Sequence, residues 1–483
     1  MSTGTPPPPP ASPQPTTPQP TTPQPTTPLP PTAADPVLRG ASEVLGGPAG
    51  RRLTGRVPWW AQPLPVLLAL TSVLVALGAL TKHRCRALGW SAPDQFTHAC
   101  YSDLPVVYTS SGLAAGLGPY ADGVSLGQPP LTAALAWLVG LFAPDGTGAD
   151  AQRGYFDAAA VVVLLAALVT VAAAAVAAGA RRRWDALLLA LSPLLVLSAL
   201  VSFDLVGVAL ATAGLAAWAR RRPVTAGLLL GLAVAARTYP LLLLLAIALV
   251  ALRAGRRRAA LTTLAVALAA WAAVNVPVAL AAPDAWSAHL RDWFGRAAGY
   301  GSPWLLPQLV ERAGGDADAT GLPPGAVTAL TVCTWVAWVL LVALLVLWAP
   351  RRPRLPQVAF LLVAGVCLLG PAFPVQASLW LAPLAALAVP RWREHLLWWA
   401  AEAASFGAVW LFIAGQSTPE RALPPQFYAL FLLLRLAALA WLVVVVVRDV
   451  RSPWRDPVRG EGLDDPAGGD VDGRADALVV RVA

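Results

Sequence analysis

Long apolar segments alternate with short polar breaks from Pro63 to Val447. A membrane-crossing helix needs about 20 mostly apolar residues, so each segment predicts one span, although several are short. The twelve segments are 63–80, 154–180, 186–202, 204–219, 223–237, 240–252, 259–282, 325–349, 357–372, 376–390, 396–414 and 427–447. The pattern therefore predicts an all-α, polytopic membrane domain over residues 63–447 with about 12 transmembrane helices.

Arginine clusters between these segments predict which loops face the cytoplasm, because cytoplasmic loops are enriched in Arg and Lys. One cluster, Arg51 to Arg56, precedes the first segment, and six follow at 181–183, 220–222, 253–258, 351–354, 391–393 and 448–451. We expect all of them, and both termini, on the cytoplasmic side of a plasma-membrane protein. The first loop, 81–127, then lies outside.

A shorter apolar segment, 128–142, breaks this alternation, and an acidic stretch, 144–150, follows it. An odd number of crossings must separate the first outer loop from the cluster at 181–183. We therefore expect 128–142 to be a helix on, or dipping into, the outer leaflet. Polar residues then gather on the outer face, and polar groups at membrane depth are costly unless they serve a site.

Composition supports the membrane assignment and excludes a soluble enzyme. The chain is 57% apolar and 13% charged, whereas a soluble chain carries roughly 25% charged residues. The net charge of +9 comes from arginines in loops, so it reflects topology and predicts no nucleic-acid partner. The Pro-rich segment 1–62 predicts a disordered cytoplasmic arm, and the Asp- and Gly-rich segment 448–483 predicts a disordered cytoplasmic tail.

Two of the four cysteines, Cys85 and Cys100, lie fifteen residues apart in the first outer loop. This compartment permits disulfides, so we predict a bridge that tethers the nearby Asp103 to the end of the first span. The four histidines show no metal-ligand spacing, and no metal residue or cofactor is assigned. A divalent metal held by His83 and His98 stays open.

Asp103 follows the first span in the sequence Ala99-Cys-Tyr-Ser-Asp-Leu-Pro105. An Asp two residues before a proline is a plausible helix N-cap, and composition alone favours that role. The functional alternative is a general base that takes a proton from an acceptor hydroxyl. Asp204 also has two interpretations, as a buried partner of Arg237 or as a residue that orients a sugar.

The order of these features resembles the GT-C class of glycosyltransferases: one span, an outer loop with an early Asp, a Pro-Pro-Leu turn at 129–131, a surface helix and many further spans. Over about Val66 to Val447 the chain more closely resembles actinobacterial members of glycosyltransferase family 87. The motifs that carry this resemblance are Tyr101-Ser-Asp-Leu-Pro, Gly118-Pro-Tyr120, Phe203-Asp-Leu205, Ala236-Arg-Thr-Tyr-Pro240 and Phe373-Pro-Val-Gln376 with Leu379-Trp-Leu-Ala-Pro383.

The resemblance implies a membrane-embedded transferase of the cell envelope. It would move a hexose, mannose in the family, from a polyprenyl-phosphate donor to a lipid- or glycan-linked acceptor on the outer face, with inversion. Asp103 would be the catalytic base, and Arg237 with Tyr239 would hold the donor phosphate. The residues expected to contact substrate are Tyr101, Tyr120, Asp204, Gln376 and Trp380.

The chain also departs from the family pattern. It has Gln128-Pro-Pro130 where relatives often carry Glu-Tyr-Pro, Phe203 where they carry Trp, and Pro374-Val-Gln-Ala377 where they carry Ser-Pro-Gln-Tyr. These changes leave open an inactive member that acts as a scaffold. A transporter or flippase for lipid-linked sugars is another alternative, since it too has many spans and few intramembrane charges.

Overall fold

The computed structural model describes residues 35–46, 58–121, 124, 126–316 and 318–479, and every regular element in these ranges is a helix. The Pro-rich repeats before residue 35 lie outside the described residues. The expectation of an all-α membrane protein is confirmed. Six described helices are long and apolar enough to cross a membrane, or seven if one bent pair forms a single span. Twelve spans stay a prediction.

The six long helices are α2 (Pro63–Thr81), α7 (Ala149–Ala177), α13 (Arg257–Ala281), α16 (Pro324–Trp348), α19 (Trp392–Ala414) and α20 (Pro425–Arg451). The bent pair runs over Ala180–Ala190 and Leu194–Val201, with a bend of 49°; it includes α8 (Leu187–Ala190) and α9 (Leu194–Leu197). Five shorter helices occupy the other predicted spans: α10 (Asp204–Ala219), α11 (Pro223–Ala236), α12 (Pro240–Arg253), α17 (Leu355–Leu369) and α18 (Ser378–Ala388).

Several of the short helices begin or end at a predicted site residue. Asp204 opens α10, Arg237 follows the last residue of α11, and Gln376 lies just before α18. The 14 residues of α11 reach only about 21 Å at about 1.5 Å per residue, less than the roughly 30 Å of a hydrocarbon core. The helices therefore stop where the polar motifs begin.

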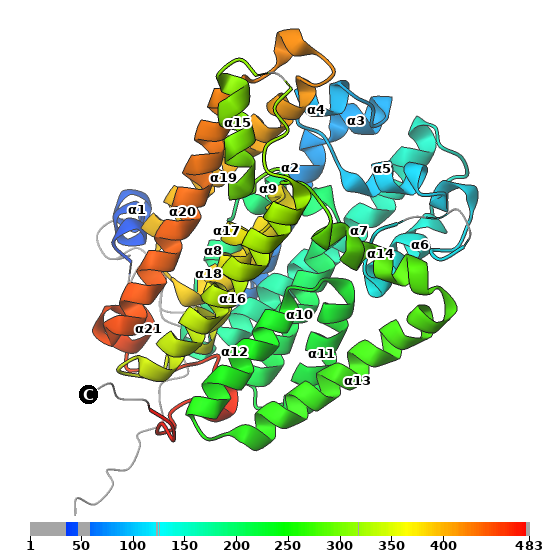
Figure 1. Ribbon diagram of the computed structural model, residues 1–483. Coiled ribbons are helices and arrows are strands. Elements are labelled where there is room, and N and C mark those ends of the chain that lie inside the picture. Colours follow the sequence, from blue (N-terminus) through cyan, green and yellow to red (C-terminus); the bar gives the residue numbers. More distant parts are fainter. Residues whose placement is uncertain (1–34, 47–57, 122–123, 125, 317, 480–483) are drawn as a thin grey trace, which may run out of the picture.

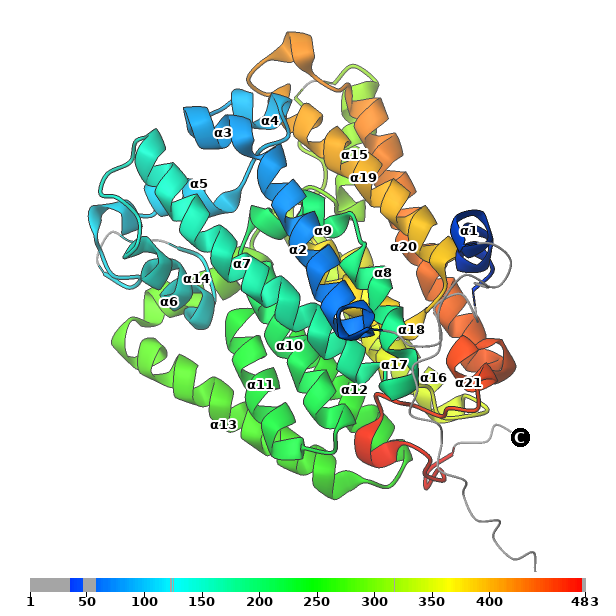
Figure 2. The same ribbon diagram turned by 180° about the vertical axis from the view of Figure 1, so that it is seen from behind.

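The helices pack in an ordered succession that Figures 1 and 2 show from opposite sides. Helix α7 lies between α2 and α10, α11 lies between α10 and α13, and α17 and α18 lie side by side. Every residue of α18 is buried. At Gly227 and Gly231 of α11, an added Cβ would lie 2.5 and 2.3 Å from backbone oxygens of α13. This small-xxx-small spacing allows the close approach of the two helices.

Short helices gather at one end of the molecule, which we call the site end (Figure 1). They are α3 (His83–Leu88), α4 (Asp94–Thr97), α5 (Asp103–Ser110), α6 (Pro130–Gly140), α14 (Pro283–Phe294) and α15 (Leu306–Ala313). Helix α6 coincides with the predicted surface helix and has only 11 residues. Within α3–α5, Cys85 and Cys100 form a disulfide with a Cα–Cα distance of 5.9 Å.

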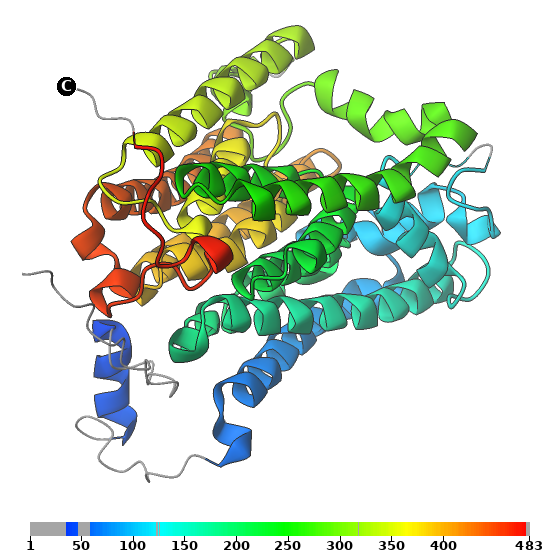
Figure 3. The same ribbon diagram turned by 90° about the horizontal axis from the view of Figure 1, so that it is seen from below.

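The C-terminal segment 452–479 packs across the opposite end, which we call the tail end (Figure 3). The prediction of a disordered tail is therefore wrong for these residues. Val471 is fully buried, and the indole of Trp218 donates to the carbonyl of Gly468 at 2.9 Å. Composition gave no sign of this packing because ion pairs, rather than apolar periodicity, hold the segment.

Those ion pairs use the arginine clusters between the spans. Arg182 pairs with Glu461, Arg253 and Arg352 pair with Asp476, and Arg354 pairs with Asp456. The clusters at 181–183, 253–258 and 351–354 thus lie together at the tail end.

The segment just before the first span also departs from the disorder expected for residues 1–62. Residues Pro36–Gly46 form α1, and the Asp35 carboxylate accepts a hydrogen bond from the backbone N–H of Trp392 at 2.9 Å.

Candidate active site

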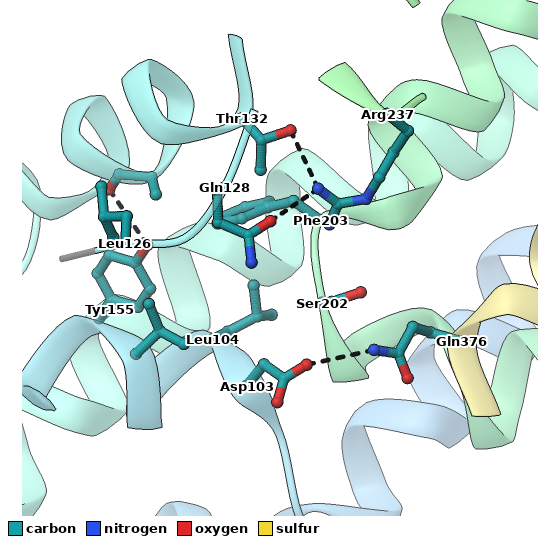
Figure 4. Close-up of a pocket in the computed structure, with 12 residues that line it drawn as sticks. Asp103, Leu104, Leu126, Gln128, Thr132, Tyr155, Ser202, Phe203, Arg237 and Gln376 are labelled. Carbon is teal, nitrogen blue, oxygen red and sulfur yellow. Dashed lines mark hydrogen bonds between the residues drawn. The ribbon is translucent and has the colours of Figure 1, made fainter. Parts of the chain in front are cut away.

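A cavity at the site end collects residues from six separate parts of the chain (Figure 4). It encloses about 440 Å³, partly open to solvent. Its polar lining comprises Asp103 from α5, Gln128 and Thr132 at the start of α6, Ser202 before α10, Arg237 after α11, and Gln376 before α18. Three of the predicted site residues, Asp103, Arg237 and Gln376, therefore line one cavity.

Asp103 opens α5 but does not cap it. The Ser102 hydroxyl accepts from the backbone N–H of Leu104 at 3.3 Å, so Ser102 fills the cap role. The Asp103 carboxylate instead accepts from the Tyr101 hydroxyl at 2.6 Å and from the Gln376 amide at 3.3 Å. The carboxylate is therefore not used by the helix terminus, and it lines the cavity.

The surroundings raise the pKa of Asp103 to about 6. Burial is the largest cause, and the charge of Asp204 adds to it, whereas the Tyr101 hydrogen bond and the cations Arg237 and Lys82 oppose it. A carboxylate with this pKa is ionised at neutral pH yet is a stronger base than an exposed one.

Arg237 is held on the opposite wall by a network of acceptors. Its Nε donates to Asp204 at 2.5 Å, and its Nη1 donates to the Gln128 side-chain oxygen at 2.7 Å and more weakly to Thr132 at 3.4 Å. The structure thus has the Asp204–Arg237 pairing that the sequence left as one alternative. No described protein group accepts from Nη2.

Asp204 is fully engaged by protein groups. Besides Arg237, it accepts from the Trp380 indole at 2.9 Å and from the Ser202 hydroxyl. Trp380 in turn stacks on Tyr239, with ring centres 4.9 Å apart. Neither ring lines the cavity, so these two predicted residues lie behind the Asp204–Arg237 pair.

The remaining predicted residues differ in their relation to the cavity. Tyr101 lies beside it through its bond to Asp103 and packs against Trp410, with ring centres 4.8 Å apart. Tyr120 does not line it, and its buried hydroxyl has no hydrogen-bond partner among the described residues.

Lys82 is a residue that the sequence analysis missed. It is the only lysine of the chain, it is fully buried, and its Nζ donates to the backbone carbonyl of Tyr101 at 2.9 Å. Burial lowers its pKa to about 7, and the nearby charge of Asp103 acts in the opposite direction. Its place directly after an apolar span resembles a snorkelling cation, so only its uniqueness could have drawn attention to it.

Within the described residues, no group of three or more His, Cys, Asp or Glu side chains is arranged to hold a metal ion. The cavity instead offers one carboxylate, one guanidinium and two amides. This set can accept a proton on one wall and bind an anion on the other.

The glycosyltransferase family 87 model matches residues 126–371, about half of the chain. The chain belongs to glycosyltransferase family 87. No curated protein matches it. As a family 87 protein it is a membrane glycosyltransferase that takes a sugar donor and an acceptor. The matched segment includes the wall built from Gln128, Asp204 and Arg237, whereas Asp103 and Gln376 lie outside it.

Proposed function

We propose that this family 87 protein transfers mannose from a polyprenyl-phosphate donor to a hydroxyl of a lipid- or glycan-linked acceptor. The observation that carries the proposal is the placement of Asp103 and Arg237 on opposite walls of one cavity. Transfer with inversion needs one base and one charge-stabilising group, which are the two groups this cavity offers.

The reaction is a single displacement. Asp103 takes the proton of the acceptor hydroxyl as its oxygen attacks the anomeric carbon. The bond between that carbon and the phosphate oxygen breaks, and the electron pair leaves with the polyprenyl phosphate. Arg237 stabilises the negative charge that develops there, and its unused Nη2 supplies a donor for it. One carboxylate suffices because phosphate leaves without a proton donor.

An apolar groove beside the cavity supports a lipid-linked donor. It encloses about 410 Å³ between α11, α12, α13 and α14, and its lining includes five leucines with Trp271 and Trp286. Two of its lining residues, Pro129 and Thr238, adjoin Gln128 and Arg237 in the chain. A polyprenyl chain in this groove would leave its phosphate near Arg237. The Trp286 indole donates a hydrogen bond to the Asn275 side-chain oxygen at 3.0 Å, which closes part of the groove wall.

The proposal includes the orientation of the protein, with the cavity on the outer face of the membrane. Three arginine clusters, at 181–183, 253–258 and 351–354, lie at the tail end, and such clusters mark the cytoplasmic side of membrane proteins. The site end then faces outward, both termini face the cytoplasm, and lipid-linked donors reach the groove from the outer leaflet of the plasma membrane.

The test is transfer from labelled polyprenyl-phosphate-mannose by membranes that contain wild-type or Asp103→Asn protein at equal abundance. We expect the variant to lose about 10²- to 10⁴-fold of the rate, the usual contribution of a positioned base. Asp94→Asn is the matched control, because Asp94 is a site-end carboxylate paired with the exposed Arg84 and does not line the cavity.

Each other outcome would contradict one defined part of the proposed function. Equal transfer by wild type and Asp103→Asn would remove Asp103 as the base. No transfer by either protein, with donor uptake across vesicles instead, would favour a transporter or flippase. No transfer and no transport, with donor binding retained, would favour an inactive scaffold.

A further inference from the structure

A buried ion pair lies outside the cavity, between the two long helices α19 and α20. Arg435 of α20 and Glu402 of α19 approach to 3.0 Å, and both are less than 5% exposed. Burying two charges within membrane helices costs more than their attraction returns unless further groups satisfy them. The positions of those further groups therefore indicate what the pair holds in place.

The donors of Arg435 converge on the segment that precedes α18. Nη1 donates to the carbonyl of Phe373 at 2.5 Å, and Nη2 donates to the carbonyl of Pro374 at 3.2 Å and to the Ser378 hydroxyl at 2.9 Å. The guanidinium also lies 3.7 Å from the centre of the Phe373 ring. Arg435 thus fixes both ends of the segment 373–378, which we call the tip.

Glu402 completes the same arrangement. It accepts from the Ser378 hydroxyl at 2.7 Å and from the Trp398 indole at 3.1 Å, in addition to Arg435. A neutral residue at 402 would leave the Arg435 charge buried without a counterion. The pair is therefore one unit whose shared target is the tip.

The tip and the first turn of α18 each carry a side chain that touches a site carboxylate. Gln376 donates to Asp103 at 3.3 Å, and Trp380 donates to Asp204 at 2.9 Å. A displacement of the tip would loosen both contacts at once. Neither Arg435 nor Glu402 lines the cavity, so any effect on the reaction must pass through the tip.

We propose that Arg435 and Glu402 are positioning residues that hold the tip, so that Gln376 stabilises the ionised form of Asp103. This inference rests on the proposed role of Asp103 as base. The charged and titratable groups that face Asp103 are Tyr101, Lys82, Asp204 and Arg237, and none of them changes in the variants below. An altered pH profile in those variants would therefore report the loss of the Gln376 contact.

The first experiment compares pH profiles of kcat/KM for Gln376→Ala, Arg435→Lys, Glu402→Gln and the double variant Gln376→Ala/Arg435→Lys. We expect the acidic limb to move to higher pH in each, and kcat to fall about 10- to 100-fold, as for lost supporting groups elsewhere. The KM for the donor should stay within about 3-fold. The double variant should match the single variants, because both substitutions remove the same contact, the one between Gln376 and Asp103.

The matched control is Arg354→Lys at the tail end. Arg354 is also buried, pairs with Asp456 and donates to two backbone carbonyls of α18, but it touches neither the tip nor the cavity. If Arg435→Lys and Arg354→Lys lower thermal stability alike and neither moves the acidic limb, Arg435 is only structural and the proposal fails.

Hydrogen exchange of the tip gives a readout that does not need transferase activity. Arg435→Lys and Glu402→Gln should speed exchange over residues 373–378, while Arg354→Lys should not. If wild-type protein fails to transfer mannose, the proposed function fails, yet faster tip exchange still supports the positioning role. Unchanged tip exchange in an active Arg435→Lys protein would overturn the inference on its own.

Discussion

The two ends of the molecule use the same interaction, a buried Arg–Asp pair, with different results. At the tail end all three guanidinium nitrogens of Arg354 donate to the protein, in four hydrogen bonds: two to Asp456 and two to backbone carbonyls. At the site end Arg237 donates through Nε and Nη1, while Nη2 has no acceptor among the described residues. Arg354 is 2% exposed, and the Arg237 side chain is 12% exposed.

The difference between Arg354 and Arg237 shows how an arginine with a structural role can be distinguished from one that is able to bind a ligand. A guanidinium has five N–H donors, and a fully satisfied one has nothing left for a ligand. Breaking such a pair removes the compensation for two buried charges. A guanidinium with an unoccupied nitrogen on a cavity can take an anion without losing its existing partner, so the presence of an acceptor at each of the three nitrogens is more informative than burial.

Deleting residues 452–483 gives the largest expected effect, and it acts on the tail end. The buried Arg253 and Arg354 would lose their acidic partners, and Arg182 would keep only Asp185; an unpaired buried charge costs about 3–5 kcal/mol. We expect the truncated protein to fail to accumulate in membranes, measured by yield after detergent extraction. Asp470→Asn is the control, since Asp470 makes no ion pair in the described tail. Normal yield of the truncated protein would show that the tail is dispensable.

Glutamine substitutions at Arg237 and Arg354 test whether the two arginines differ in role. Arg237→Gln should fold normally and lose about 10²- to 10³-fold of the transfer rate, as for a removed charge-stabilising donor. Arg354→Gln should lose about 3–5 kcal/mol of stability and retain its rate per folded molecule. The measurements are thermal unfolding and transfer at equal folded concentration. A stability loss at Arg237 as large as that at Arg354 would contradict the distinction.

Replacing both Cys85 and Cys100 by serine tests the site end alone. A disulfide that closes a loop of about 15 residues contributes roughly 3 kcal/mol in the chain-entropy account. The bridge also supports Lys82, which donates to the Ala99 and Tyr101 carbonyls beside Cys100. We expect faster hydrogen exchange over α3–α5 and reduced transfer, with exchange in the tail unchanged. Loosening of both ends would show that they are not independent.

The sequence predicted the all-α membrane fold class, because that depends on local hydrophobic patterns, and it named three of the residues that line the cavity. Asp103, Arg237 and Gln376 are far apart in the chain and were grouped only through the order of family motifs and their expected outer placement. The packed tail was missed because its acidic residues find partners more than 100 residues away. Lys82 was missed for a similar reason, since its acceptors are backbone carbonyls in the next loop.

Opposite pKa shifts at the two ends give the smallest expected effect and the most direct contrast. The folded-state pKa of Asp103 is raised, so ionising it costs stability as the pH rises from its unfolded value through about 6. Burial alone would raise the pKa of Asp456, but the charge and hydrogen bond of Arg354 leave it lowered. The stability that Asp456 contributes is therefore present at neutral pH and is lost only as the pH falls through that lowered value.

Asparagine substitutions should consequently have opposite signs at pH 8. Asp103→Asn should raise the melting temperature by on the order of 2 °C, because it removes a charge that the cavity disfavours. Active-site residues often lower the stability of the protein that needs them for activity. Asp456→Asn should lower it, because Arg354 loses its counterion. The Asp103 difference should shrink as the pH is lowered toward 4, where protonation of Asp103 makes the wild type resemble the first variant. The Asp456 difference should persist at pH 4, because the lowered pKa keeps Asp456 ionised there. Equal signs at pH 8 would mean that Asp103 is held as tightly as Asp456, and the site end would then be a second structural clamp.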